Sequence, residues 1–162
     1  MDIEIRLAYD KPDMIGELFR EYTEMLIEND PSIIDYLILQ NYEDEIKHLE
    51  RKYGQPKGRL YIAYINNTPA GCIGLRAIDD TTCEIKRLYV RPEFRGHKLG
   101  IRLMDQVVTD ARTIGYHSMV LDTLPYLNSA IALYKSYGFY EIPSYNNSPM
   151  KYSIFMRYDL ME

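Results

Sequence analysis

The segment at 83–104, CEIKRLYVRPEFRGHKLGIRLM, constrains the fold of this chain more than any other. It begins with the alternation of a β-strand, passes through Arg-Pro and a basic stretch with glycines, and ends with the apolar spacing of a helix. The first N–H groups of such a helix have no partner within the helix. Together with the helix dipole, they form a site for an anion such as a phosphate group.

The turn between the strand and the helix strengthens this interpretation without proving it. Gly96 and Gly100 let the backbone approach a ligand closely, and Arg95 and Lys98 add positive charge. The turn matches neither the GxxxxGK[ST] phosphate loop nor a complete GxGxxG fingerprint. Glycines are also frequent in strand-to-helix turns for steric reasons. The segment taken alone therefore fits both a phosphate site and a plain tight turn.

The apolar residues of the strand change phase within it. In a regular strand Ile85 shares a face with Arg87 and Tyr89, yet the next good core residues are Leu88 and Val90. A β-bulge gives the one-residue shift that removes this mismatch. It also leaves backbone N–H groups without a strand partner, so that a ligand can use them.

Composition predicts a single globular domain over residues 1–162. The chain is 46% hydrophobic and 27% charged, which is typical of globular proteins. No stretch approaches the ~18 apolar residues of a membrane span, and the N-terminus MDIEIRLAYD resembles neither a signal nor a transit peptide. We therefore expect a cytoplasmic protein that does not bind a membrane. A net charge of −5 and a pI near 5.3 argue against a nucleic-acid partner.

The cysteines predict neither a disulfide nor a metal site. Cys72 and Cys83 belong to the two strands of one predicted hairpin. If the hairpin turns near 79–80, Cys83 faces residue 77, which lies too far along the strand from Cys72 for a disulfide. The histidines have no HExxH or CxxC pattern around them, and two thiols alone do not form a metal site.

The order of the predicted elements indicates a mixed sheet with helices on both faces, which is an α/β or layered α+β domain. A helix begins near Pro12, a second is capped by Asn41 and stopped by Gly54, and further helices cover 98–114 and 129–137. Strands are predicted at 3–9, 59–65, 70–78, 82–90, 118–123, 139–142 and 152–160.

A second segment, NSAIALYKSYGF at 128–139, helps to interpret the first one. RGHKLG (95–100) and AIALYKSYGF (130–139), in this order, resemble the two signatures of the GNAT superfamily of N-acetyltransferases. The predicted elements also resemble that fold from end to end, with its mixed, mostly antiparallel sheet. There are two departures. Lys98 stands where the family usually has glycine, and the asparagine that often precedes the tyrosine falls at Leu127, so that Asn128 is one place late.

The resemblance implies acetyl-coenzyme A as cosubstrate, with no metal. The bulged strand would bind the pantetheine arm through the backbone of Leu88, Tyr89 and Val90, and Asn128 would assist. The diphosphate would bind the N–H groups of the turn and the first helical residues, which are Arg95, Gly96, His97, Lys98, Leu99, Gly100 and Ile101.

The resemblance also places the catalytic tyrosine of the family at Tyr134. A phenol of ordinary pKa ~10 can give a proton to a departing thiolate of comparable basicity. An N–H near Leu88 would polarise the thioester carbonyl. Glu84 is the expected general base, commonly through water, with Asp122 as its rival. Each of these residues also has an ordinary structural interpretation, as a core tyrosine or as a paired carboxylate.

The acceptor pocket is expected between the first two helices and the loop at 143–152. Glu24, Glu28 and Asp35 would suit a small amine, although a solvated helix face is the more usual explanation for such residues. We therefore expect a small-molecule amine as partner. A protein or peptide acceptor and a non-catalytic coenzyme A sensor are the alternatives, and a homodimer is compatible with the family.

Overall fold

The computed structural model describes residues 1–39, 41–148 and 150–161. Its strands are β1 (Ile3–Leu7), β2 (Arg59–Ile65), β3 (Thr68–Ala77), β4 (Thr82–Val90), β5 (Ser118–Thr123), β6 (Tyr140–Ile142) and β7 (Ile154–Asp159). Its helices are α1 (Pro12–Asn29), α2 (Ile33–Leu39), α3 (Tyr42–Lys47), α4 (Leu49–Tyr53), α5 (Leu99–Ile114) and α6 (Asn128–Tyr137). A short 3₁₀ turn, η1 (Pro92–Phe94), joins β4 to α5.

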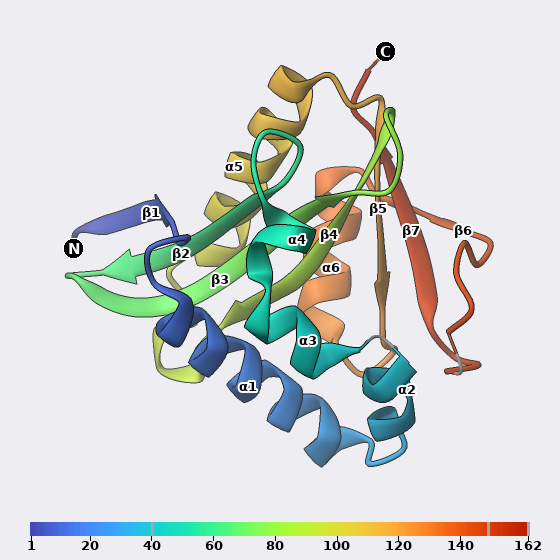
Figure 1. Cartoon of the computed structure of the whole chain (residues 1–162), viewed down its shortest axis with the longest axis horizontal. Helices are drawn as coiled ribbons and strands as arrows, with labels where there is room; N and C mark the ends of the chain where they lie inside the picture. The colour runs from blue at the N-terminus through green and yellow to red at the C-terminus, as the bar shows by residue number, and fades with distance from the viewer. Residues whose placement is uncertain (40, 149, 162) are drawn as a thin grey trace.

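The strands form one sheet in the order β1-β2-β3-β4-β5-β7-β6. All neighbours are antiparallel except β4 and β5. Helices α1, α3 and α4 lie over one face and α5 and α6 over the other (Figure 1). A large core fills the space between the sheet and α5, and a second core lies under α1 and α4. The predicted fold class, a mixed and mostly antiparallel sheet between helices, is confirmed.

The parallel strands β4 and β5 pair over only a short length. Their register covers three residue pairs and ends where Glu84 meets Val120. The β5 side of β4 from Ile85 to Val90 therefore has no strand partner in the described parts of the chain. The sheet is therefore open between these two strands, and this opening positions the candidate site.

The predicted β-bulge in β4 is confirmed. Cys72 of β3 faces Tyr89, whereas Gly74 faces Lys86, so β4 has one extra residue between these pairs. Arg87 sits at the bulge with a φ of 59°, in the left-handed region.

The bulge changes the face to which the following side chains point. Ile85, Leu88 and Val90 all pack into the core beneath α5, and Tyr89 is buried in the core beneath α1. The β-bulge therefore explains the change of phase in the apolar residues of β4, as we inferred from the sequence.

The region between α1 and β2 differs from the prediction. The structure adds α2, which we did not predict, and divides the helix expected before Gly54 into α3 and α4. Asn41 does precede α3, but with φ 57° and ψ 48° and without a side-chain capping hydrogen bond. Within the described residues, no helix has both the length and the apolar character needed to cross a bilayer.

The hairpin of β3 and β4 has the predicted register. Cys83 faces Ala77 across the two strands, as the position of the turn indicated. Cys72 and Cys83 are both buried free thiols.

Candidate active site

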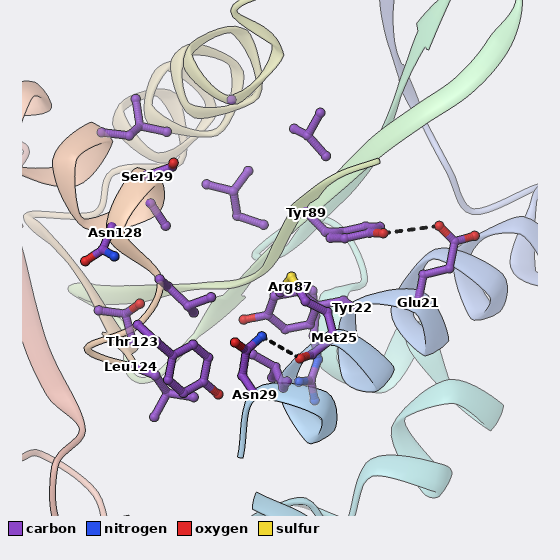
Figure 2. Close-up of a pocket in the computed structure, with 18 of the residues that line it drawn as sticks. Glu21, Tyr22, Met25, Asn29, Arg87, Tyr89, Thr123, Leu124, Asn128 and Ser129 are labelled. Carbon is purple, nitrogen blue, oxygen red and sulfur yellow. Dashed lines mark hydrogen bonds between the residues drawn. The ribbon is translucent and has the colours of Figure 1, made fainter. Parts of the chain in front are cut away.

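A cavity of about 870 Å³ lies where β4 and β5 diverge. Its walls come from α1, α2, the bulged part of β4, the beginning of α5, the end of β5 and the beginning of α6. In Figure 2 the side chains of α1 and those at the start of α6 face each other across it. Segments far apart in the sequence thus meet at one space large enough for a cosubstrate-sized molecule.

The bulged strand supplies one wall. Leu88, Tyr89 and Val90 all line the cavity. The Tyr89 hydroxyl donates to Glu21 on α1 at 3.3 Å, and the Arg91 guanidinium donates to both oxygens of Glu21. These contacts hold α1 against the end of β4, and Figure 2 shows the Tyr89–Glu21 bond at the edge of the cavity.

The turn before α5 supplies the cationic end of the cavity. Lys98 occupies the N-cap position with φ 60° and ψ 27°, and no side chain caps the helix there. The N–H groups of the first turn are therefore left for another acceptor. Of the residues predicted to hold a diphosphate, Arg95, Gly96, Lys98, Leu99, Gly100 and Ile101 line the cavity, whereas the exposed His97 does not.

Helix α6 brings Tyr134 to the cavity. The side chain is 6% exposed and packs against Phe139 with the ring centres 5.7 Å apart. Burial raises the pKa of the Tyr134 phenol well above its usual range, and the nearby Tyr22 and Asp122 raise it further. The phenol is therefore protonated at physiological pH, and it is a weaker acid than a free phenol.

Asn128 and Ser129 line the cavity at the beginning of α6 (Figure 2). Leu127, not Asn128, occupies the N-cap position of this helix. Asn128 is therefore the first residue of the helix and not its cap. Its side chain is exposed.

The two candidate bases have different environments. Glu84 is 3% exposed, lies outside the lining of the cavity, and accepts hydrogen bonds from Arg76 Nε at 2.8 Å and from the Tyr145 hydroxyl. Asp122 lines the cavity at the end of β5 and accepts from Asn146 Nδ2 at 3.1 Å. Its charge acts on both Tyr22 and Tyr134.

A buried ion pair lies behind the bulge, and the sequence analysis did not predict it. Arg87 donates from Nε to Glu45 Oε2 at 2.9 Å and from a second nitrogen to Oε1 at 3.2 Å. Lys52 and the Tyr53 hydroxyl also donate to Glu45. Burial alone would raise the pKa of Glu45, but Arg87 and Lys52 lower it to about 2. The partners are 42 residues apart in the chain, so local patterns cannot reveal them.

The end of the cavity between α1 and β5 is mainly apolar. Its walls include Met25 and Leu26 of α1, Ile33 and Leu37 of α2, and Leu124 after β5. These residues belong to, or pack against, a small core of their own.

The carboxylates predicted for the acceptor site are only partly at this end. Glu24 and Glu28 line the cavity, and the exposed Asp35 does not. The loop predicted to complete the site approaches through Tyr145 and Asn146, and its Pro149 lies outside the described residues. No cluster of three or more potential metal ligands occurs among the described residues.

The sequence matches the acetyltransferase (GNAT) family over residues 15–139. It is 41% identical to an uncharacterised N-acetyltransferase of Schizosaccharomyces pombe over 76% of this chain and 77% of that protein. An uncharacterised N-acetyltransferase of Dictyostelium discoideum is 33% identical over 92% of this chain and 94% of its own. The fold is similar to that of the PaiA N-acetyltransferase of Thermoplasma acidophilum in complex with coenzyme A, with a TM-score of 0.76, 21% identity, and coverage of 98% of this chain and 99% of that one.

Proposed function

Because the chain belongs to the acetyltransferase (GNAT) family, we propose that it transfers an acetyl group from acetyl-coenzyme A to the primary amine of a small molecule. The amine attacks the thioester directly while both substrates are bound. The observation that carries this proposal is the position of Tyr134, a buried phenol in the wall of a cavity that also contains an unpaired strand edge and an uncapped helix N-terminus.

The two unpaired backbone features fit the two parts of coenzyme A. The pantetheine arm binds along β4 at Leu88, Tyr89 and Val90, in the manner of an added strand. The diphosphate binds the N–H groups from Arg95 to Ile101, including that of His97, and the Arg95 and Lys98 side chains add charge. Asn128, which lines the cavity from α6, would contact the arm. The coenzyme A complex of the similar PaiA structure supports this choice of cosubstrate.

The chemistry needs an acid, a base and a polarising donor. The N–H of Leu88 stabilises the oxyanion that forms when the amine nitrogen bonds to the carbonyl carbon. As the carbon–sulfur bond breaks, Tyr134 gives its proton to the thiolate. Of the two carboxylates, the lining of the cavity favours Asp122 as the acceptor of the amine proton, whereas Glu84 lies outside this lining and is hydrogen-bonded to Arg76 and Tyr145.

Replacing Tyr134 by phenylalanine tests this function. We expect kcat to fall by about 10²- to 10⁴-fold because the thiolate loses its proton donor. The Kd of acetyl-coenzyme A, measured by calorimetry, should stay unchanged. Tyr137→Phe is the matched control, because Tyr137 is on the same helix but lies outside the cavity lining and donates to Asp105.

Turnover should be followed by thiol release over a panel of amines, amino acids and peptides. Equal rates for Tyr134→Phe and the parent protein would remove Tyr134 from the mechanism. Tight binding of acetyl-coenzyme A without turnover on any acceptor would favour a coenzyme A sensor, and turnover on peptides alone would favour a protein acceptor.

A further inference from the structure

Lys86 is a buried cation in the wall of the cavity. It lies on β4 just before the bulge, is 8% exposed, and lines the cavity. Its ammonium makes no hydrogen bond or ion pair with another side chain in the described ranges of the chain. A charge taken out of water in this way is costly unless an opposite charge meets it.

The nearby carboxylates are engaged by other cations. Glu84, two residues away on the same strand, accepts from Arg76 and Tyr145. Glu45 accepts from Arg87 and Lys52, and the charge of Lys52 also acts near Lys86. In and behind this part of the wall, the four cations Lys86, Arg87, Lys52 and Arg76 therefore outnumber the carboxylates Glu84 and Glu45, before Asp122 of β5 is counted.

The strand geometry places Lys86 opposite Asp122. Glu84 of β4 pairs with Val120 of β5, and Lys86 and Asp122 each follow two residues later, where the parallel strands have begun to diverge. Side chains two residues apart share a face of the sheet. Lys86 and Asp122 therefore face the same side of the opening from its two edges.

This face is the side of the sheet covered by α1. The residues adjacent to Lys86 and Asp122 along their strands, Ile85 and Leu121, pack in the core under α5 on the opposite face. Asp122 in turn lies near enough to Tyr134 to influence its titration. A cation and an anion thus flank the place where the acceptor amine would attack.

We propose that the acceptor is a free amino acid whose carboxylate pairs with Lys86 while its amine lies toward Asp122 and the thioester. The apolar wall formed by Met25, Leu26 and Leu124 then receives an apolar side chain. The inference rests on the proposed acetyl transfer, and the products are the N-acetylated amino acid and the free thiol of coenzyme A.

Matched substrates test the assignment directly. Thiol release from acetyl-coenzyme A is measured with L-phenylalanine and L-leucine, and with 2-phenylethylamine and 3-methylbutylamine, which lack only the carboxylate. We expect kcat/KM to be about 10- to 100-fold higher for the amino acids, the range of a charge-assisted hydrogen bond. Equal or better turnover of the simple amines would overturn the inference and leave the acetyl transfer standing.

Variants of Lys86 test whether this residue causes the preference for amino acids over the simple amines. Lys86→Met should raise KM for the amino acids by about 10- to 100-fold, leave kcat/KM for the simple amines unchanged, and so abolish the preference. Lys86→Arg should retain part of it, because the charge is kept. Lys47→Met makes the same change at an exposed position on α3 and should have no effect.

Two other results would contradict the proposal. An equal loss on both substrate classes in Lys86→Met would mean that Lys86 has only a structural role. No transfer to any of the four compounds, with acetyl-coenzyme A bound in calorimetry, would overturn the inference; turnover on other amines would then preserve the proposed function, and its absence there would remove both.

Discussion

At the scale of single residues, the Glu45–Arg87 pair should make the free energy of unfolding depend on pH in the acidic range. The carboxyl has a pKa of about 2 in the folded protein against an ordinary value of 4.5. A lowered pKa means that the pair stabilises the fold above pH 4.5 and that this contribution is lost as the pH falls toward 2. We expect the free energy of unfolding to decrease by about 3 kcal/mol over this window. Urea unfolding at a series of pH values measures it.

Variants of two glutamates on α3 separate this effect from general acid sensitivity. Glu45→Gln leaves the buried Arg87 without its counter-ion and should cost about 3–5 kcal/mol at neutral pH. It should also remove most of the pH slope. Glu43→Gln, at an exposed position, should change neither quantity. A wild-type slope in Glu45→Gln would show that other carboxylates cause the acid sensitivity.

Single residues also show which parts of the site a sequence can reveal. Tyr134 and the turn from Arg95 to Gly100 were predicted from short continuous segments that resemble family signatures, and all of them except His97 line the cavity. The partnership of Arg87 with Glu45 and the position of Lys86 opposite Asp122 depend on segments that meet only in the folded domain. No spacing in the sequence encodes such contacts.

At the scale of elements, the turn before α5 combines a strained backbone with a cationic side chain. Lys98 has φ 60° and ψ 27°, a conformation that costs a residue other than glycine about 1–2 kcal/mol. Lys98→Gly relieves this strain but adds freedom to the unfolded chain. We therefore expect the free energy of unfolding to stay equal or rise by at most about 1 kcal/mol. Denaturant titration measures this.

The same substitution should weaken the binding of acetyl-coenzyme A. Loss of one ammonium near the diphosphate should raise its Kd by about 5- to 10-fold at low salt, and less at high salt because ions screen the charge. Lys98→Asn is the control, since asparagine tolerates the left-handed conformation without a charge. Calorimetry should give the same loss for both variants. Unchanged affinity in both would place the Lys98 ammonium away from the phosphates.

Elements differ in how far their sequence specifies them. The bulge in β4 was predictable because the pleat imposes a strict period of two, so a slip of one residue is visible. Helix α2 was missed because Ile33–Leu39, with the sequence IIDYLIL, is short and almost uniformly apolar. Such a run has no amphipathic period and fits a strand as well as a helix. Tertiary packing of Ile33 and Leu37 decides its conformation.

At the scale of the whole molecule, the sheet has two parts with few direct links. Strands β1 to β4 form one part and β5 to β7 the other, and three parallel residue pairs join them. The cavity opens at this junction and is lined from both parts. A molecule of coenzyme A bound there would contact β4 and α5 on one side and α6 on the other, and would therefore add links that the polypeptide lacks.

Binding of acetyl-coenzyme A should consequently stabilise the entire domain. A ligand at 100 times its Kd adds about 2.7 kcal/mol to the free energy of unfolding. For a chain of this length, this corresponds to a rise in Tm of about 5–10 °C in thermal unfolding. Pantetheine, which can occupy the β4 edge but lacks the diphosphate, should bind far more weakly and shift Tm little at the same concentration. Under the proposed function the N–H groups at the start of α5 bind the phosphates, so an equal shift with pantetheine would mean that this turn does not bind the cosubstrate.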